Sequence, residues 1–184
     1  RSLMALTILI AFSLGLLTWT FTEYAMHNWV GHKAKGKNAF SKEHLKHHRL
    51  GNYFTPWAGK TLRTVVVLSK IFAITLFIFG TVIAAAFTIG FAVGYAWYEY
   101  LHWSLHVNPP RHSYGRWARR HHFHHHFENP KMNHGVTTPL WDIIFGTHQA
   151  PATIRVPKKI VMPWLIDPVS RTVYGEYVAD FKLR

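Results

Sequence analysis

The chain contains no cysteine and few acidic residues. Of its 184 residues none is Cys, and only 8 are Asp or Glu. The absence of thiols excludes disulfides, Cys-ligated iron–sulfur clusters, thiolate-bound haem and Cys-containing zinc sites. So few carboxylates also disfavour a metal site built mainly from bridging Asp and Glu. Any metal centre would therefore depend on imidazole, and the chain has 15 His.

Long uncharged segments indicate a membrane protein. Residues Leu3–Phe21 carry no charge, and Leu62–Tyr98 carries only Arg63 and Lys70. A helix needs about 20 apolar residues to cross the hydrocarbon core of a bilayer. The first segment suffices for one span, and the second for two spans joined by a tight turn near Gly80, with a re-entrant hairpin as the alternative. We predict an all-α integral membrane helical bundle with two to four spans.

A cleaved signal peptide is the competing interpretation of the N-terminal apolar segment. The segment is long, and it continues without a small-residue cleavage site into Glu23 and His27. Because these two residues resemble parts of a functional site, we favour a retained span.

The basic residues predict the orientation in the membrane. The formal net charge is +13, and Lys and Arg gather in the two polar segments that follow the apolar ones. Positive charge marks the cytoplasmic side, so the second apolar segment must cross the membrane and return. We expect one membrane-embedded domain over 1–184: a span at 3–24, a cytoplasmic segment at 25–61, a helical hairpin at 62–101 and a cytoplasmic segment at 102–184. Topology and anionic lipid explain the charge, and we expect no nucleic-acid partner.

The histidines form four groups with helix-compatible spacing. In chain order these are His27-x4-His32, His44-x2-His47-His48, His102-x3-His106 and the run His121–His126. Residues at i and i+3 or i+4 share a helix face, with Cβ atoms about 5–6 Å apart, so members of one group can converge on one metal. Adjacent His point about 100° apart, so an HxxHH triplet can also serve two neighbouring metals. Haem is the competing cofactor, but these imidazoles lie too close together for separate haems.

Two of the groups are ambiguous from spacing alone. On a regular helix His27 and His32 point about 140° apart. Because Gly31 lies between them, we expect either a loosened helix or ligands for different metals. The run His121–His126 contains two overlapping HxxHH patterns, and spacing does not choose between them.

Five of the eight acids lie close to the His groups. These are Glu23, Glu43, Glu99, Glu128 and Asp142. A ligating His commonly donates its second N–H to a carboxylate or a carbonyl. We interpret Glu43 and Glu99 as such orienting groups, with charge balance near a basic surface as the alternative.

No nucleotide-binding motif accompanies the His groups. The chain has no Gly-rich dinucleotide fingerprint. Gly90 and Gly94 lie in an apolar segment, where small residues four apart are typical of close helix packing. We therefore expect no cofactor-binding loop.

The order of the four His groups resembles the fatty acid hydroxylase/sterol desaturase superfamily. The segment Gly135–Thr147, GVTTPLWDIIFGT, resembles the signature that follows its last His box, and the likeness is greatest to the fatty acid 2-hydroxylase branch, over about residues 22–147. In that branch eight residues separate the last His pair from the signature Gly, which fits His126 and Gly135. The resemblance implies metal ligands at His27, His32, His44, His47, His48, His102, His106, His122, His125 and His126. It leaves out His112, His121, His124, His134 and His148, of which His134 is the least secure exclusion because it directly precedes the signature.

The resemblance also implies a chemistry. It indicates a membrane di-iron monooxygenase that uses O2 and external electrons to hydroxylate a C–H bond of a lipid acyl chain, with C2 of a fatty acid or sphingolipid acyl chain as the candidate carbon. Two metal ions are expected, with iron as the metal and zinc able to replace it at imidazole ligands. No residue beyond the ligands is assigned a catalytic role.

The expected partners are a membrane lipid and an electron donor. Enzymes of this branch often carry a fused cytochrome b5 domain, and these 184 residues contain no such domain. We therefore expect a separate donor, either cytochrome b5-like or ferredoxin-like with a reductase.

Two other functions compete with this prediction. A sterol or carotenoid hydroxylase or desaturase would have similar His boxes. A metal transporter or sensor belongs to a different class, and transport predicts ligands along a pore near the membrane midplane. The His groups lie at the ends of the apolar segments instead, which disfavours transport.

Overall fold

The computed structural model describes residues 2–184. They form two compact units, each described here by itself. One unit contains the residues up to Glu23 together with Thr55–Glu99, and the other contains Tyr24–Phe54 and Tyr100–Arg184. The helices α1 and α4 contribute residues to both units.

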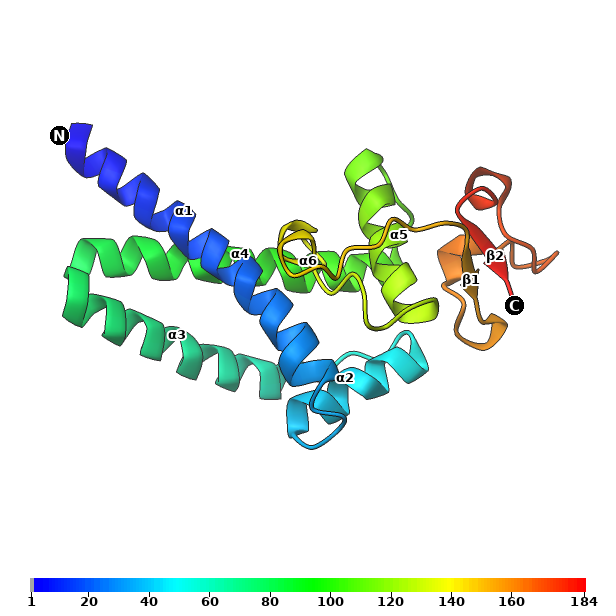
Figure 1. The fold of residues 1–184 in the computed structure, drawn as a ribbon, viewed down its shortest axis with the longest axis horizontal. Helices are drawn as coiled ribbons and strands as arrows, with labels where there is room; N and C mark the ends of the chain where they lie inside the picture. Colours follow the sequence, from blue (N-terminus) through cyan, green and yellow to red (C-terminus); the bar gives the residue numbers. More distant parts are fainter. Residues whose placement is uncertain (1) are drawn as a thin grey trace. The chain divides into compact units, whose positions relative to one another are not determined.

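Three apolar helices dominate the first unit. They are α1 (Ser2–Ala25), α3 (Trp57–Phe79) and α4 (Thr81–Val107). Each is long and apolar enough to cross a membrane, and the first candidate span continues to His32. This number lies within the predicted two to four, and the chain is an integral membrane protein of mostly helical structure. Gly80 alone separates α3 from α4, and its φ of 80° provides the tight turn visible in Figure 1.

Small residues bring α1 and α4 into close contact within the first unit. A Cβ placed on Gly15 would lie 2.1 Å from the carbonyl oxygen of Phe87, and one on Gly90 would lie 2.1 Å from that of Phe12. A Cβ on Gly94 would meet the Trp19 side chain at 2.8 Å. The interpretation of Gly90 and Gly94 as packing residues is confirmed.

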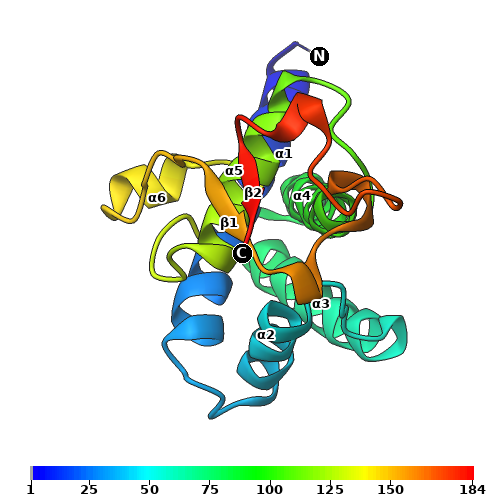
Figure 2. The same cartoon turned by 90° about the vertical axis from the view of Figure 1, so that its right-hand side faces the viewer.

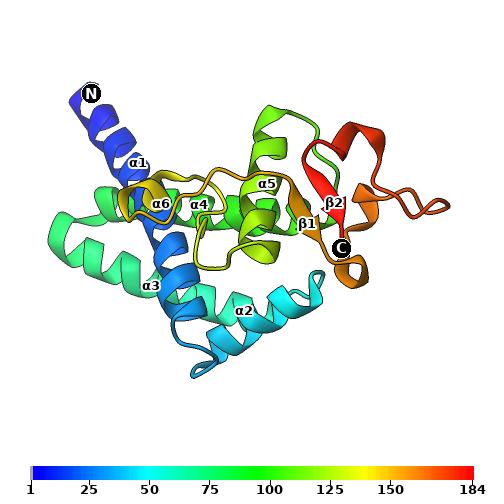
Figure 3. The same cartoon turned by 45° about the vertical axis from the view of Figure 1, so that its right-hand side comes forward.

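The second unit begins with a change of helix type. The residues Met26–His32 form a π-helix, η1, which extends α1. The helix α2 (Ala39–Leu50) follows and packs against η1, as Figure 3 shows. The Asn38 side chain caps α2 by accepting a hydrogen bond from Ser41 N.

The remaining elements of the second unit are short except for α5 (Ser113–Phe127). His112 caps α5, because its Nδ1 accepts a hydrogen bond from Gly115 N at 3.1 Å. A loop then leads to the one-turn helix α6 (Leu140–Ile144).

The C-terminal segment contains a small parallel sheet that the sequence analysis did not predict. Its strands are β1 (Ile154–Val156) and β2 (Phe181–Leu183), and three 3-10 turns lie between them: η2 (Lys158–Ile160), η3 (Pro163–Leu165) and η4 (Gly175–Tyr177). Strands of three residues are too short to show a periodic pattern. The strand β1 packs beside α5 (Figure 2). Asp180 forms ion pairs with Arg116 and Arg120 of that helix.

Candidate metal centre

Ten histidines of the second unit gather into two groups of five, and within each group the potential ligand atoms all lie within 4.8 Å of one another. We call these groups the first and the second cluster. The first cluster contains His27, His32, His44, His48 and His125, and the second contains His47, His102, His106, His122 and His126. These are the ten residues that the resemblance indicated. Each cluster has the composition of a metal site built from imidazole alone.

The two HxxHH triplets each contribute to both clusters. In α2, His44 and His48 belong to the first cluster and His47 to the second. In α5, His125 belongs to the first cluster, whereas His122 belongs to the second. Because adjacent residues point about 100° apart on a helix, one triplet can reach two neighbouring sites, as the spacing suggested.

The π-helix explains how His27 and His32 reach the same cluster. The hydrogen bonds of a π-helix join residues five apart, so the two rings come to one side of η1, with ring centroids 5.3 Å apart. The predicted loosening of the helix is confirmed, and both rings lie in the first cluster. Gly31 also leaves room for the ring of His44, because a Cβ on Gly31 would lie 3.0 Å from that ring.

The ring nitrogens face one another inside each cluster. In the first, His32 Nε2 lies 2.8 Å from His44 Nε2 and 2.9 Å from His125 Nε2. In the second, Nε2 of His106 lies 2.9 Å from that of His122. Several other buried Nε2 atoms have no hydrogen-bond partner among residues 2–184, namely those of His27, His48 and His126. Buried polar atoms rarely lack a partner, and convergent imidazole nitrogens are a suitable ligand set for a transition metal.

Burial keeps these imidazoles neutral. Desolvation, reinforced by the neighbouring rings, lowers the pKa of His44 and His48 in α2 well below the ordinary value of a histidine. The same causes lower the pKa of His122, His125 and His126 in α5. Neutral imidazole is the form that binds metal, so these five histidines are ready for coordination.

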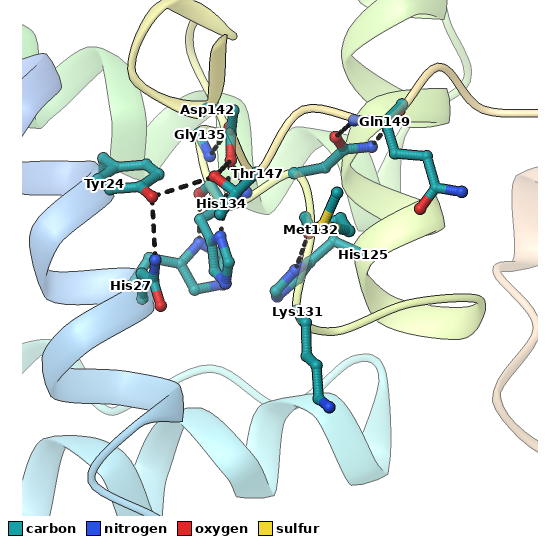
Figure 4. Close-up of polar contacts among 12 residues, drawn as sticks. Tyr24, His27, His125, Lys131, Met132, His134, Gly135, Asp142, Thr147 and Gln149 are labelled. Carbon is teal, nitrogen blue, oxygen red and sulfur yellow. Dashed lines mark hydrogen bonds and ion pairs between the residues drawn. The ribbon is translucent and has the colours of Figure 1, made fainter. Parts of the chain in front are cut away.

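Backbone carbonyls select the ligating nitrogen of three rings. His27 Nδ1 lies 2.5 Å from the carbonyl oxygen of His134, and His125 Nδ1 lies 2.7 Å from that of Met132 (Figure 4). His47 Nδ1 lies 2.7 Å from the carbonyl oxygen of Tyr53. A carbonyl oxygen can only accept, so each Nδ1 carries the proton and each Nε2 keeps its lone pair for a metal.

The carboxylate of Asp142 holds the loop that supplies two of these carbonyls. It is completely buried and accepts hydrogen bonds from the backbone N–H of His134 at 2.8 Å and of Gly135 at 2.7 Å (Figure 4). Thr147 Oγ1 donates to it at 2.8 Å, and His121 Nε2 lies 3.4 Å away. Burial by itself would raise the pKa of Asp142, but these hydrogen bonds outweigh it and hold the pKa well below the usual range.

The two acids interpreted as orienting groups have other hydrogen-bond and ion-pair partners. Glu43 accepts a hydrogen bond from the hydroxyl of Tyr53 at 2.5 Å, and the carbonyl of Tyr53 orients His47. Glu99 forms a salt bridge with Lys60 at 2.6 Å. Asp142 supports the first cluster through the His134 backbone, a role that its position near the His groups did not predict. The position of Asp142 within the signature segment Gly135–Thr147 was the feature of the sequence that could have indicated this role.

The five excluded histidines all lie outside both clusters. His121 contacts Asp142, and His124 Nδ1 lies 3.3 Å from Asn133 Nδ2. His112 caps α5, and the ring of His148 packs 5.6 Å from that of His121. His134 joins the surroundings of the first cluster through its carbonyl, in line with its insecure exclusion.

Known proteins resemble this chain over most of its length. A family model described as fatty acid hydroxylase matches residues 12–147. A dihydroceramide fatty acyl 2-hydroxylase of Arabidopsis thaliana is 32% identical, over 79% of this chain and 62% of that protein. A fatty acid 2-hydroxylase of Rattus norvegicus is 30% identical, over 74% of this chain and 38% of that protein. A solved structure described as full-length scs7p, with only its hydroxylase domain visible, is 26% identical with a TM-score of 0.62, over 80% of this chain and 61% of that one. The chain thus spans less than two thirds of each of these proteins.

Proposed function

Since this chain belongs to the fatty acid hydroxylase family, we propose that it hydroxylates a C–H bond of a lipid acyl chain. The observation that carries the proposal is the pair of adjoining five-histidine clusters. The names of the relatives favour C2 of a fatty acyl or ceramide acyl chain as the carbon attacked. O2 is the expected oxidant and co-substrate.

The ten clustered histidines are the proposed metal ligands, five for each of two ions. Iron is the expected metal, and zinc is able to occupy the same imidazole ligands. Bound iron would supply the activation of O2 that oxidation of an unactivated C–H bond requires. The protein's own contribution is to keep the imidazoles neutral and to direct Nε2 inward at His27, His47 and His125.

Apolar rings border the second cluster. Phe54 packs against His102 and His106, with ring centroids 5.9 and 5.7 Å apart, and Phe123 lies 5.1 Å from His106. Such walls exclude water from a site where a reactive oxidant would otherwise be lost to solvent. They also suit the hydrocarbon part of a lipid.

Asp142 is the proposed positioning residue for the first cluster. It fixes the backbone of His134 and Gly135, and the His134 carbonyl in turn orients His27. The Tyr24 hydroxyl lies 3.0 Å from Thr147 Oγ1 and accepts a hydrogen bond from Asn28 at the same distance. The network thus ties the loop to the helix that carries His27.

The orientation and partners of the protein follow from its charge and its chemistry. By the positive-inside rule, the basic residues of 25–61 and 102–184 support a cytoplasmic position for both clusters, within one membrane-embedded hydroxylase domain over 1–184. The lipid substrate would reach the clusters from the membrane. Hydroxylation with O2 needs two electrons, and a separate cytochrome b5-like or ferredoxin-like donor with a reductase would supply them.

Lipid mass spectrometry after expression in a host that lacks hydroxylated acyl chains tests the proposal. Under 18O2 the wild-type chain should yield acyl chains with one labelled hydroxyl group, and His102→Ala should yield none. His148→Ala is the matched control, because this histidine lies outside both clusters, and it should retain the product. A new double bond in place of a hydroxyl, or unchanged product in His102→Ala, would contradict the proposal.

A further inference from the structure

The one-turn helix α6 and Phe145, which follows it, expose four large apolar side chains. The exposed fractions are 39% for Leu140, 60% for Ile143, 56% for Ile144 and 45% for Phe145. Exposed apolar residues are common singly, but a contiguous patch marks a contact surface. Leu140, Ile143 and Ile144 are three and four positions apart on α6, so their side chains share one face of the helix. With Phe145 they form such a patch.

The surface of α6 also lacks charge. Between Val136 and Thr147 the only ionisable side chain is Asp142, which is fully buried. The outward face of α6 is therefore wholly apolar in a chain of net charge +13. An acidic or otherwise charged partner would find no complementary group on this face.

The apolar patch continues onto the end of the first candidate span. The ring of Phe145 stacks on Tyr24 with centroids 5.2 Å apart and packs edge-on against Trp29 at 5.9 Å. Tyr24 and Trp29 both belong to the candidate span that ends at His32, and Trp29 is itself exposed. Tyrosine and tryptophan concentrate where a span meets the membrane–water interface, and the exposed ring of Trp29 lies at that end of the candidate span, next to Phe145.

We propose that α6 is embedded in the interfacial layer of the bilayer, with Leu140, Ile143, Ile144 and Phe145 in contact with lipid acyl chains. This contact does not depend on the proposed hydroxylase activity. It gives α6 two faces, because its inner face carries the carboxylate that holds the His134 loop. The lipid surface would thereby support the element that positions the first cluster.

The absence of cysteine makes a direct test possible. In Ile143→Cys the new thiol is the only one in the chain and can be labelled with an environment-sensitive nitrobenzoxadiazole dye. The labelled protein is reconstituted in phosphatidylcholine vesicles with and without brominated acyl chains, and iodide serves as the aqueous quencher. Lys182→Cys, at an exposed charged position of β2, is the matched control for a dye that is exposed to water.

The dye at position 143 should show blue-shifted emission, loss of fluorescence with brominated lipid and little loss with iodide. The dye at position 182 should show the reverse. Iodide quenching at 143 equal to that at 182 would overturn the proposal, because α6 would then face water. Protection from both quenchers would also overturn it, because position 143 would then be covered by protein. Ile144→Cys repeats the measurement if Ile143→Cys does not fold.

Discussion

The two clusters contain the same number of imidazoles but have different supports. In the first, His27 and His125 are oriented by the carbonyls of one loop, residues 132–134, which the buried carboxylate of Asp142 holds. In the second, His47 is oriented by the Tyr53 carbonyl close to it in sequence. The two clusters therefore depend on different residues outside the ligand set. A substitution of one supporting residue should affect one cluster and leave the other unchanged.

A buried arginine supports the second cluster. The guanidinium of Arg119 in α5 donates hydrogen bonds to the carbonyls of Ser104 at 2.9 Å and Asn108 at 3.0 Å, at the end of α4. These helices carry four of the five histidines of that cluster. Burial lowers the pKa of Arg119 to about 10, still above neutral pH, so the side chain stays charged where the helix dipole of α4 is negative.

Asp142→Asn should produce the largest difference in metal affinity between the two clusters. An amide has one acceptor oxygen where the carboxylate has two, and its NH2 would face an N–H donor. Metal affinity of the first cluster should fall about 10–100-fold, as for other residues that orient ligands. Metal content measured by mass spectrometry after dialysis should drop from two ions per chain toward one.

The control for Asp142→Asn is Asp180→Asn, which removes a buried carboxylate that pairs with Arg116 and Arg120. It should lower the unfolding temperature and leave two metal ions bound. Equal metal loss in both variants would show that Asp142 has only a general structural role.

Arg119→Met should weaken the second cluster instead. The carbonyl of Asn108 would lose its hydrogen bonds from Arg119, whereas that of Ser104 keeps the backbone N–H of Asn108. An unpaired carbonyl costs about 1–3 kcal/mol, so the free energy of unfolding should fall in a denaturant titration. The remaining bound metal should lie in the first cluster, where a further His44→Ala substitution would release it. Loss of metal from the first cluster alone would refute the assignment of Arg119.

Tyr53→Phe should have a smaller effect. It removes the hydroxyl that donates to Glu43 but keeps the carbonyl that orients His47. A loss of about 1 kcal/mol in unfolding free energy is expected, with both metal ions retained. A drop in metal content would mean that Glu43 acts on His47 more strongly than its indirect contact suggests.

The smallest effect concerns the ion pair of Glu128 with Arg155, neither of which belongs to a cluster. Their hydrogen bonds lower the pKa of Glu128, so the pair stabilises the protein above the carboxyl's unfolded pKa and the gain is lost as pH falls through its folded pKa. Glu128→Gln should be slightly less stable than wild type at pH 7 and indistinguishable from it in strong acid. Thermal unfolding at a series of pH values measures this, and a difference that persists in strong acid would contradict the sign.

Much of the architecture was readable from local patterns. Apolar segments of sufficient length predicted the spans, and the freedom of Gly80 to adopt a positive φ fits the turn placed near it. The small sheet was not predictable, because its two strands are short and lie far apart in the chain, with Ile154 opposite Phe181. Such pairing depends on contacts that no local pattern contains.

The sequence by itself determined that imidazole is the available ligand type and that each HxxHH triplet can serve two metals, because composition and helical period are local properties. Within the run His121–His126 it left two registers open, and a family resemblance was needed to choose between them. Only the tertiary structure decided which ring belongs to which cluster, that η1 is a π-helix, and that Asp142 supports His27 through a neighbouring carbonyl. These depend on how separate helices and one loop pack around a common centre, and that packing arises only when residues distant in sequence meet.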